Sequence, residues 1–284
     1  MLANPRSERV KAVRALSGRS ARLRKGRFVV EGPQAVREAL HAGAVAELYA
    51  TDDAAFRFPD LVATAPAVRR VTPQVLAAMA GDGGTVTPQG LLAVCPLVGV
   101  PLDDILTAAL RLVAVLAQVR DPGNAGTVIR AADAAGADAV VLIDASVDVH
   151  NPKCVRATAG SLFHLPIVTG VPLSQAVAGL RAAGLSVLAA DGAGEHDLDD
   201  LLDAAAAGAG PLAGPAAWVF GNEAWGLPEE DRSLADATVR VPVHGRAESL
   251  NLATAATVCL YASARALRAD QRRARNPREP TRRI

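Results

Sequence analysis

The sequence predicts an α/β protein with two folded regions, the second of which is built on a parallel sheet. In the second region, short runs that are apolar throughout alternate with helical patterns. Strands without polar alternation are typical of a parallel sheet that is covered by helices on both faces. The stretch 96–101, with two prolines and a glycine, separates this region from a smaller mixed one. Half of the 284 residues are hydrophobic, which allows a sizeable core.

The first region contains helical and strand patterns in alternation. Helices are expected over residues 6–16 and 33–41, where apolar residues recur at helical spacing. The strand candidates are short and rich in β-branched or aliphatic residues, and they lie at 28–30, near Leu48, near Val71, and at 91–95. This region is predicted to form a compact α/β unit.

The second region alternates buried strands with helices. The expected strands are residues 112–117, 139–143, 186–190, 218–220 and 239–241. Helices are expected over 125–135, after Pro152, and over 250–267 as a long closing helix, while the Ala- and Gly-rich stretch 203–215 looks like a loop after a short helix. We therefore predict an N-terminal domain at 1–98, a linker at 99–108, a main domain at 109–268 and a basic, disordered tail at 269–284.

Charge is distributed unevenly along the chain, although the net charge is only +1. Residues 1–40 carry ten Lys and Arg against three acids, and residues 265–284 carry eight Arg against two acids. The central part is acidic, with 12 basic and 24 acidic residues. Two positive ends suggest a polyanionic partner, although a solvated basic helix and a disordered tail would give the same pattern.

Neither a targeting segment nor a metal site is indicated. The basic N-terminus lacks the apolar stretch of a secretory signal, and no run of about 18 apolar residues occurs. We therefore expect a soluble, cytoplasmic protein. Cys95, Cys154 and Cys259 lie far apart, without the spacing of a zinc site or a disulfide framework, and are expected to be small buried hydrophobic residues.

Common nucleotide and hydrolase motifs are missing. The nearest approach to a dinucleotide-binding glycine fingerprint, residues 191–194 (DGAG), lacks the third glycine and leads into an acidic run. No GxxxxGK[ST], GxSxG or HExxH pattern occurs, and the five histidines form no recognisable set.

One unusual stretch is residues 119–130, VRDPGNAGTVIR, between a predicted strand and a helix. Asp-Pro-Gly favours a turn, and Asn124 lies near the helix start, where its side chain can cap the helix or reach outward. Arg130 lies about two turns further along the helix. A routine ion pair between Arg130 and Asp133 would explain this arginine without any function, and both interpretations stay open.

Two further stretches follow predicted strands. Residues 220–228, FGNEAWGLP, place a glycine where backbone groups can approach a ligand at the carboxyl edge of a sheet. The alternative is an ordinary turn with Glu223 as a solvated acid. Residues 241–251, VPVHGRAESLN, lead into the closing helix, and a capping role for Ser249 would by itself explain them.

Together these motifs are specific. The order NAGxxxR, FGNExxGL and VPV to SLN, at these separations, closely resembles the SpoU (TrmH) family of the SPOUT superfamily of RNA methyltransferases. Residues 22–33, RLRKGRFVVEGP, look like the family's N-terminal substrate-binding domain. Residues 151–153 (NPK) and 160–163 (GSLF) are similar to its catalytic domain, so the resemblance covers nearly the whole chain.

The resemblance implies a fold and a chemistry. It implies a SPOUT-type catalytic domain with a deep C-terminal trefoil knot, and a homodimer whose active site is completed across the interface. Members transfer a methyl group from S-adenosylmethionine to a ribose 2′-hydroxyl, without a metal. The cofactor positions that it implies are Gly221, Val241 and Leu250. The polar active-site set that it implies is Asn124, Arg130, Glu223, Ser249 and Asn251.

Arg130 would handle the 2′-hydroxyl by helping to deprotonate it. Alternatively, since a guanidinium is a poor base at neutral pH, Arg130 would bind the adjacent phosphate while phosphate or water takes the proton. Asn124 and Ser249 would orient Arg130 and the ribose, and Glu223 and Asn251 would support the surrounding loops.

The expected substrate is 23S ribosomal RNA. Because only 3% of the residues are aromatic, recognition should depend on phosphate contacts from Arg22, Arg24 and Lys25 of the N-terminal domain. A tRNA ribose methyltransferase is the alternative within the same chemistry. A non-catalytic RNA-binding or ribosome assembly factor is the alternative from another class, but it would not require Asn124, Arg130, Ser249 and Asn251 together.

Overall fold

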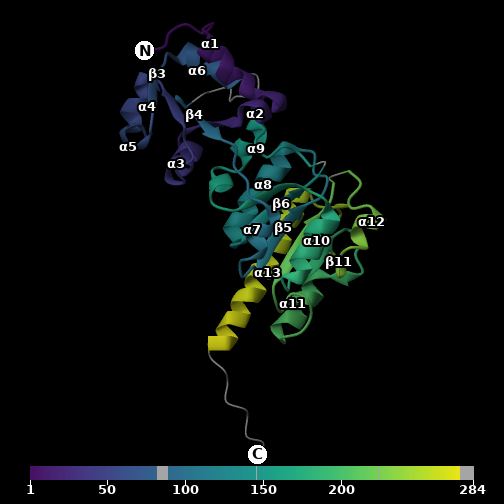
Figure 1. The fold of residues 1–284 in the computed structure, drawn as a ribbon. Helices are drawn as coiled ribbons and strands as arrows, with labels where there is room; N and C mark the ends of the chain where they lie inside the picture. Colours follow the sequence, from purple (N-terminus) through teal and green to yellow (C-terminus); the bar gives the residue numbers. More distant parts are fainter. Residues whose placement is uncertain (82–88, 145, 223, 276–284) are drawn as a thin grey trace, which may run out of the picture. The chain divides into compact units, whose positions relative to one another are not determined.

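The computed structural model describes residues 1–81, 89–144, 146–222 and 224–275. The chain divides into two compact units (Figure 1). The first unit comprises residues 1–99, 121–130 and 147–165, and the second comprises residues 100–120, 131–146 and 166–284. The boundary is therefore not a single point near residue 98, because two later segments pack with the N-terminal region.

The first unit contains a four-stranded mixed sheet in the order β1-β4-β2-β3. The strands are β1 (Arg27–Glu31), β2 (Glu47–Ala50), β3 (Val68–Arg70) and β4 (Leu91–Pro96). β4 pairs antiparallel with β1 and β2, whereas β2 and β3 are parallel. The short helical elements of this unit are α1 (Glu8–Arg14), η1 (Ala15–Ser17), α2 (Arg19–Lys25), α3 (Pro33–His41), α4 (Asp52–Arg57), α5 (Pro59–Thr64), α6 (Pro73–Ala80), α9 (Pro152–Ala157) and η3 (Ser161–Phe163).

Helices α1 and α6 cover one face of this sheet. Val10 and Val13 of α1 pack with Leu76 and Met79 of α6 in one buried cluster that also includes Tyr49 of β2. The ends of these helices are set by local signals, since Ser7 caps α1 and Thr72 caps α6 with side-chain oxygens that accept backbone N–H groups.

The second unit contains a seven-stranded sheet in the order β7-β6-β5-β10-β8-β11-β9, and all its strand pairs are parallel. The strands are β5 (Leu112–Leu116), β6 (Ala139–Ile143), β7 (Ile167–Val171), β8 (Ser186–Ala190), β9 (His196–Asp197), β10 (Ala216–Phe220) and β11 (Ala237–Arg240). This confirms the predicted parallel sheet. Its helices are α7 (Leu102–Leu106), α10 (Leu173–Ala182), α11 (Leu198–Ala206), α12 (Glu229–Arg232) and α13 (Leu252–Arg275).

Helices cover both faces of the parallel sheet (Figure 1). On one face, α7 and α10 pack on Val113 and Val115 of β5 and on Val219 of β10. On the other face, the indole N–H of Trp218 in β10 donates a hydrogen bond of 2.8 Å to Ser263 of α13, and both side chains are buried. Alternation along β10 sends neighbouring residues to opposite faces, so one strand holds both helical layers.

Two sequence predictions need correction. The predicted linker contains α7, whose Leu102 and Ile105 are buried in the core of the second unit. The predicted disordered tail begins too early, because α13 continues to Arg275, and residues 276–284 lie outside the described part. No helix among the described residues is both long and apolar enough to cross a membrane.

Candidate active site

A cavity of about 740 Å³ lies in the second unit, where four parallel strands end. Its walls come from the loops that follow β8, β10 and β11 and from the first turns of α13. The cavity thus lies at the carboxyl edge of the sheet, which is the edge where open parallel sheets bind ligands. Gly221, Val241, Ser249 and Leu250, four of the residues expected at a site, line this cavity.

Gly221 is a glycine because no side chain fits there. A Cβ atom at this position would lie 2.5 Å from the carbonyl carbon of Gly226 and 2.7 Å from the nitrogen of Leu227. The chain therefore turns back on itself directly after β10, and it exposes main chain rather than side chain at the cavity wall. Main-chain groups next to apolar walls are suited to bind the edge of a flat heterocycle.

The loop after β10 is fixed by a buried asparagine that sequence reasoning missed. Asn222 is 6% exposed, and its amide donates to the backbone oxygen of Gln118 (2.9 Å) and accepts from the backbone N–H of Ala224 (2.9 Å). Its backbone also exchanges two hydrogen bonds of 2.9 Å with Gly226. Asn222 thus ties the loop after β10 to the loop after β5. Its place in the FGNE motif was the available signal.

Charged residues also line the cavity. Asp191 follows β8 directly, and Arg232 lies 3.5 Å from its carboxylate. Arg240, at the end of β11, forms an ion pair of 3.3 Å with Asp197. In the sequence, Asp191 stands out only as part of the incomplete glycine fingerprint of residues 191–194. Its position right after a buried strand was the signal that places it at the carboxyl edge of the sheet.

Asn251, and not Ser249, caps the closing helix. The side-chain oxygen of Asn251 accepts the backbone N–H of Ala253 (2.9 Å), and its backbone oxygen accepts that of Ala255. The alternative reading of Ser249 as the helix cap is therefore wrong, and the exposed Ser249 side chain remains at the cavity wall. Glu223 lies outside the described residues.

Asn124 and Arg130 lie on α8 (Pro122–Ala135), in the part of this helix that belongs to the first unit. Asp121 accepts the backbone N–H of Asn124 (2.8 Å) and the ammonium of Lys153 (2.6 Å), and the bond from Lys153 lowers the pKa of Asp121. Arg130 is exposed, and the described part of the chain offers it no ion-pair partner, Asp133 included. The alternative, an ion pair between Arg130 and Asp133, is therefore not formed in the structure.

Gly126 of the same motif allows close helix packing. A Cβ atom there would lie 2.4 Å from the backbone oxygen of Cys154 and 2.7 Å from the Cβ of Ala157. The backbone of α8 at Gly126 therefore packs directly against α9 within the first unit. The small residues of the NAG motif position the helix that carries Asn124 and Arg130.

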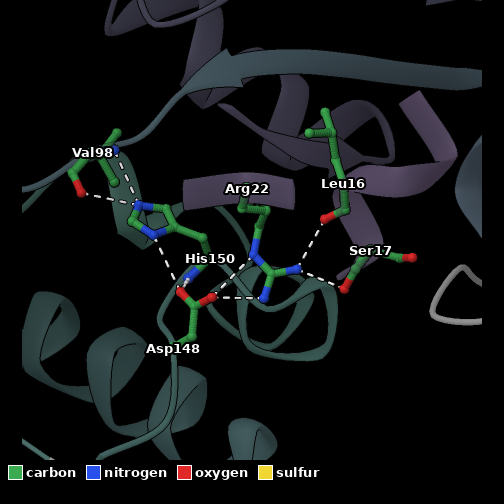
Figure 2. A network of polar contacts seen from close by, with 6 residues as sticks. All are labelled: Leu16, Ser17, Arg22, Val98, Asp148 and His150. Carbon is green, nitrogen blue, oxygen red and sulfur yellow. Dashed lines mark hydrogen bonds and ion pairs between the residues drawn. The ribbon is translucent and has the colours of Figure 1, made fainter. Parts of the chain in front are cut away.

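Arg22 is buried, in contrast to its expected role in RNA binding. It is 2% exposed, and its Nε and Nη2 donate to one carboxylate oxygen of Asp148 (3.0 and 2.6 Å) (Figure 2). Nη1 donates to the backbone oxygens of Leu16 and Ser17. Because its Nε and both Nη atoms already donate hydrogen bonds inside the first unit, Arg22 does not contact RNA phosphates, and this prediction is wrong.

His150 extends this network within the first unit. Its Nδ1 lies 3.3 Å from the second carboxylate oxygen of Asp148, and its Nε2 faces the backbone nitrogen and oxygen of Val98 (Figure 2). Burial disfavours the charged form of Asp148. The hydrogen bonds from His150 and Arg22 outweigh this effect and hold the pKa of Asp148 well below its usual range.

Arg24 and Lys25 remain exposed on α2. Lys25 and Arg27 line a groove of about 630 Å³ in the first unit, together with Arg9 and Glu47. Glu47 is already paired, because Arg9 and Arg69 both form ion pairs with its carboxylate. The cations of this groove therefore outnumber its unpaired acids.

The cysteines are buried and free, as predicted. Burial raises the pKa of each thiol to about 12. The described residues contain no group of three side chains that could hold a metal ion.

Comparison with known proteins identifies the family. The model of the SpoU rRNA Methylase family matches residues 111–261, and that of the MRM3-like substrate binding domain matches residues 7–93. The chain is 34% identical to the Bacillus subtilis 23S rRNA (guanosine(2553)-2′-O)-methyltransferase RlmP, over 90% of this chain and 96% of that protein. It is 31% identical to the Streptomyces viridochromogenes 23S rRNA (uridine(2479)-2′-O)-methyltransferase, over 93% and 96%.

The fold of this chain is also similar to that of a solved rRNA methyltransferase. The AdoMet-bound rRNA methyltransferase from Sinorhizobium meliloti superposes with a TM-score of 0.80 at 31% identity, covering 94% of this chain and 97% of that one. The matches span both units, and they place the cavity after β10 within the matched methylase region. The chain belongs to the SpoU rRNA methylase family.

Proposed function

We propose that this protein transfers a methyl group from S-adenosylmethionine to a ribose 2′-hydroxyl of 23S ribosomal RNA. The observation that carries the proposal is the cavity at the carboxyl ends of β8, β10 and β11, whose wall contains Gly221, Val241 and Leu250. The relatives described above are named as 23S rRNA 2′-O-methyltransferases, and the Sinorhizobium structure is described as AdoMet-bound. They are named for different nucleotides, so the proposal does not assign the base.

The cavity fits the cofactor in size and chemistry. Its volume of about 740 Å³ lies within the range of about 300–1,000 Å³ that is usual for small-molecule sites. Main chain at Gly221 and the apolar side chains of Val241 and Leu250 would hold the adenosine part. The bound cofactor supplies an electrophilic methyl group, so the residues of this chain have to align it with the hydroxyl, an effect that can contribute about 7–11 kcal/mol.

Arg130 would act on the substrate as a cation. An exposed guanidinium is protonated at neutral pH, and its planar donors match a phosphate bidentately. We assign Arg130 to the phosphate next to the reacting ribose, with phosphate or water accepting the hydroxyl proton. Asn124 and Ser249 would orient this arginine and the ribose. Asn251 caps α13 and so fixes the end of the 241–251 loop. Glu223 is proposed to support the loops around the site.

Three finer features belong to the same proposal. We propose a trefoil knot around the 241–251 loop, supported by the family match. We propose a homodimer, supported by the half-exposed Tyr261 and the exposed Val258 on the small-residue helix α13. Since ribosomal RNA is the proposed substrate, we place the protein in the cytoplasm.

Arg24 and Lys25 are proposed to contact RNA phosphates. Both are exposed at the end of α2, and Lys25 continues into the basic groove that Arg9 and Arg27 line. The match of residues 7–93 to a substrate-binding domain supports the placement of the RNA on this unit.

The test is transfer of labelled methyl groups from S-adenosylmethionine to purified 23S rRNA and, separately, to bulk tRNA. We expect label in 23S rRNA, recovered as a 2′-O-methylnucleoside, and a decrease in kcat of at least about 100-fold in Arg130→Ala, because the contact that positions the phosphate next to the reacting ribose is lost. Arg181→Ala, which removes an exposed arginine paired with Asp236, is the matched control and should retain activity.

The outcomes separate the alternatives. Label only in tRNA would replace the substrate while keeping the chemistry. No label in either RNA, or in intact large ribosomal subunits, would contradict catalysis and favour a binding or assembly role.

A further inference from the structure

An exposed tryptophan stands at the edge of the cavity. Trp225 lines the cavity and is 53% exposed, whereas the only other tryptophan, Trp218, is fully buried. Burying a tryptophan side chain stabilises a fold by several kcal/mol at about 25 cal/mol per Å², and the exposed Trp225 forgoes this stabilisation. Unlike the exposed Phe56 on α4, Trp225 is exposed at the wall of the cavity, and this position points to a ligand.

Hydrogen bonds tie the backbone on both sides of Trp225. Trp225 lies in the turn between Asn222 and Gly226, which is closed by the two reciprocal backbone hydrogen bonds of 2.9 Å. Gly226 adopts a left-handed backbone with φ of 68°, which favours glycine. The buried Asn222 side chain fastens this turn to the loop after β5. Asn222 and Gly226 are thus hydrogen-bonded to each other, and Asn222 also to the loop after β5, which limits the entropy lost when a flat partner stacks on the ring.

A cation lies over the same ring. The guanidinium carbon of Arg120 is 5.2 Å from the centroid of the Trp225 ring, within the distance of a cation–π contact. Arg120 is exposed and comes from the loop after β5. The planar N–H donors of a guanidinium next to the exposed indole face are suited to the phosphate of a nucleotide that stacks on the ring. S-adenosylmethionine has a net positive charge, because it carries a sulfonium and an ammonium against one carboxylate. The part of the cavity next to Trp225 and Arg120 therefore suits a nucleotide with its phosphate better than it suits the cofactor.

We propose that Trp225 and Arg120 form a platform for the RNA nucleotide that is methylated. The base stacks on the indole face opposite Arg120, and the guanidinium contacts a phosphate of the same strand. Base stacking on aromatic rings tolerates any base identity, and unpaired nucleotides are the usual targets of such contacts. This inference rests on the proposed function and makes Trp225 a positioning residue for its substrate.

The first experiment separates RNA recognition from cofactor binding. Kinetics with 23S rRNA and calorimetry with S-adenosylmethionine are compared in the wild type, Trp225→Ala, Trp225→Phe and Phe56→Ala. Loss of one stacked base predicts a decrease in kcat/KM for RNA of about 10- to 100-fold in Trp225→Ala, with the cofactor Kd unchanged. Trp225→Phe keeps a ring and should recover most of the activity. Phe56, an exposed aromatic residue on α4, is the matched control and should be neutral.

Charge is tested with Arg120→Gln. Removing one phosphate contact to a single strand should reduce the slope of log K against log salt concentration by about 0.7 in RNA binding. An unchanged slope would overturn the phosphate contact of Arg120.

The second experiment does not require methyl transfer. A 12-nucleotide single-stranded RNA is added to the wild type, and the tryptophan fluorescence is recorded. Because Trp218 is buried against α13, we expect quenching that comes from Trp225 and is absent in Trp225→Phe. The shape of the variant is retained, so a missing signal is not a folding defect.

The outcomes distinguish this platform from the proposed function. An active wild type with an equally active Trp225→Ala would overturn the platform alone, as would a parallel loss of cofactor affinity. An inactive wild type whose Trp225 emission is quenched by RNA would contradict the methyl transfer and support the platform. Absence of quenching in the wild type would overturn the platform.

Discussion

Arg22 shows how one buried contact changes the role of a basic residue. Residues 22, 24 and 25 look alike in the sequence, and all three were expected to meet phosphates. Helix geometry separates them, because successive residues point about 100° apart and only Arg22 turns inward from α2. Its partner Asp148 lies 126 positions away, so no local pattern could have predicted the ion pair.

The Arg22–Asp148 pair predicts a stability defect. Asp148→Asn would leave a guanidinium buried at 2% exposure without its counter-charge, and breaking such a pair costs about 3–5 kcal/mol. Urea denaturation should show this decrease in the free energy of unfolding. Asp60→Asn removes the partner of Arg37 from an exposed pair and should cost less than about 1 kcal/mol.

The pH dependence has a definite sign. The folded-state pKa of Asp148 is lowered, so its contribution to stability is fully present above the unfolded value of about 3.9. The contribution decreases as the pH falls below that value toward the folded pKa. The stability difference between wild type and Asp148→Asn should therefore narrow below about pH 4. A difference that stays constant down to pH 3 would contradict the assignment.

At the scale of elements, strongly apolar segments could be predicted closely and weakly patterned ones could not. β6, β8 and α3 have the predicted bounds, because each is either a run of buried aliphatic residues or a helix with a clear apolar face and a proline at its start. β7 and α10 were not predicted. β7 is exposed over its second half, and α10 begins at Leu173 after Pro172, which offers no side-chain cap.

The cavity was predictable in part for the same reason. The loops after β10 and β11 carry motifs, so Gly221, Val241, Ser249 and Leu250 could be named from the sequence and lie together. Asp191 and Arg240 are single residues at strand ends, and they line the same cavity because β8 and β11 are neighbours in the sheet. Strand order is a property of tertiary packing, which no local pattern contains.

The turn after β10 predicts a cofactor-binding defect. Gly221→Ala would place a methyl group 2.5 Å from the backbone of Gly226, so the turn has to move away from the cavity wall. Such overpacking costs about 1–3 kcal/mol, and we expect the affinity for S-adenosylmethionine to fall about 5- to 150-fold in calorimetry. Gly214→Ala adds the same group where nothing lies within 4 Å and should bind normally. Equal affinities in both variants would show that the main chain at Gly221 does not contact the cofactor.

At the scale of the whole molecule, basic and acidic residues are concentrated in different parts of the chain, and the net charge stays low. A net charge of +1 gives little general attraction to RNA, so binding has to come from local basic surfaces. The groove of the first unit is one such surface, because Glu47 is neutralised by Arg9 and Arg69 while Lys25 and Arg27 line the same wall. Of the three α2 residues that were expected to contact RNA, burial of Arg22 leaves Arg24 and Lys25 exposed.

Removal of these two charges should therefore weaken RNA binding through salt-dependent contacts alone. In the double variant Arg24→Gln, Lys25→Gln we expect the slope of log K against log salt concentration for 23S rRNA to fall by about 1.4–1.8, because two phosphates lose their partners. The affinity for S-adenosylmethionine should not change, since the cofactor cavity is lined only by residues of the second unit. Filter binding across a salt series and calorimetry measure the two quantities.

The control for this variant removes the same charge from the same unit. Arg57 and Arg70 are exposed but already form ion pairs with Asp53 and Asp52, so Arg57→Gln, Arg70→Gln removes cations whose field is largely cancelled. If the RNA is held by the specific surface at α2, the control keeps nearly the wild-type slope. If both double variants lose the slope equally, the RNA responds to the total charge of the first unit. In that case Arg24 and Lys25 have no special role in placing the substrate.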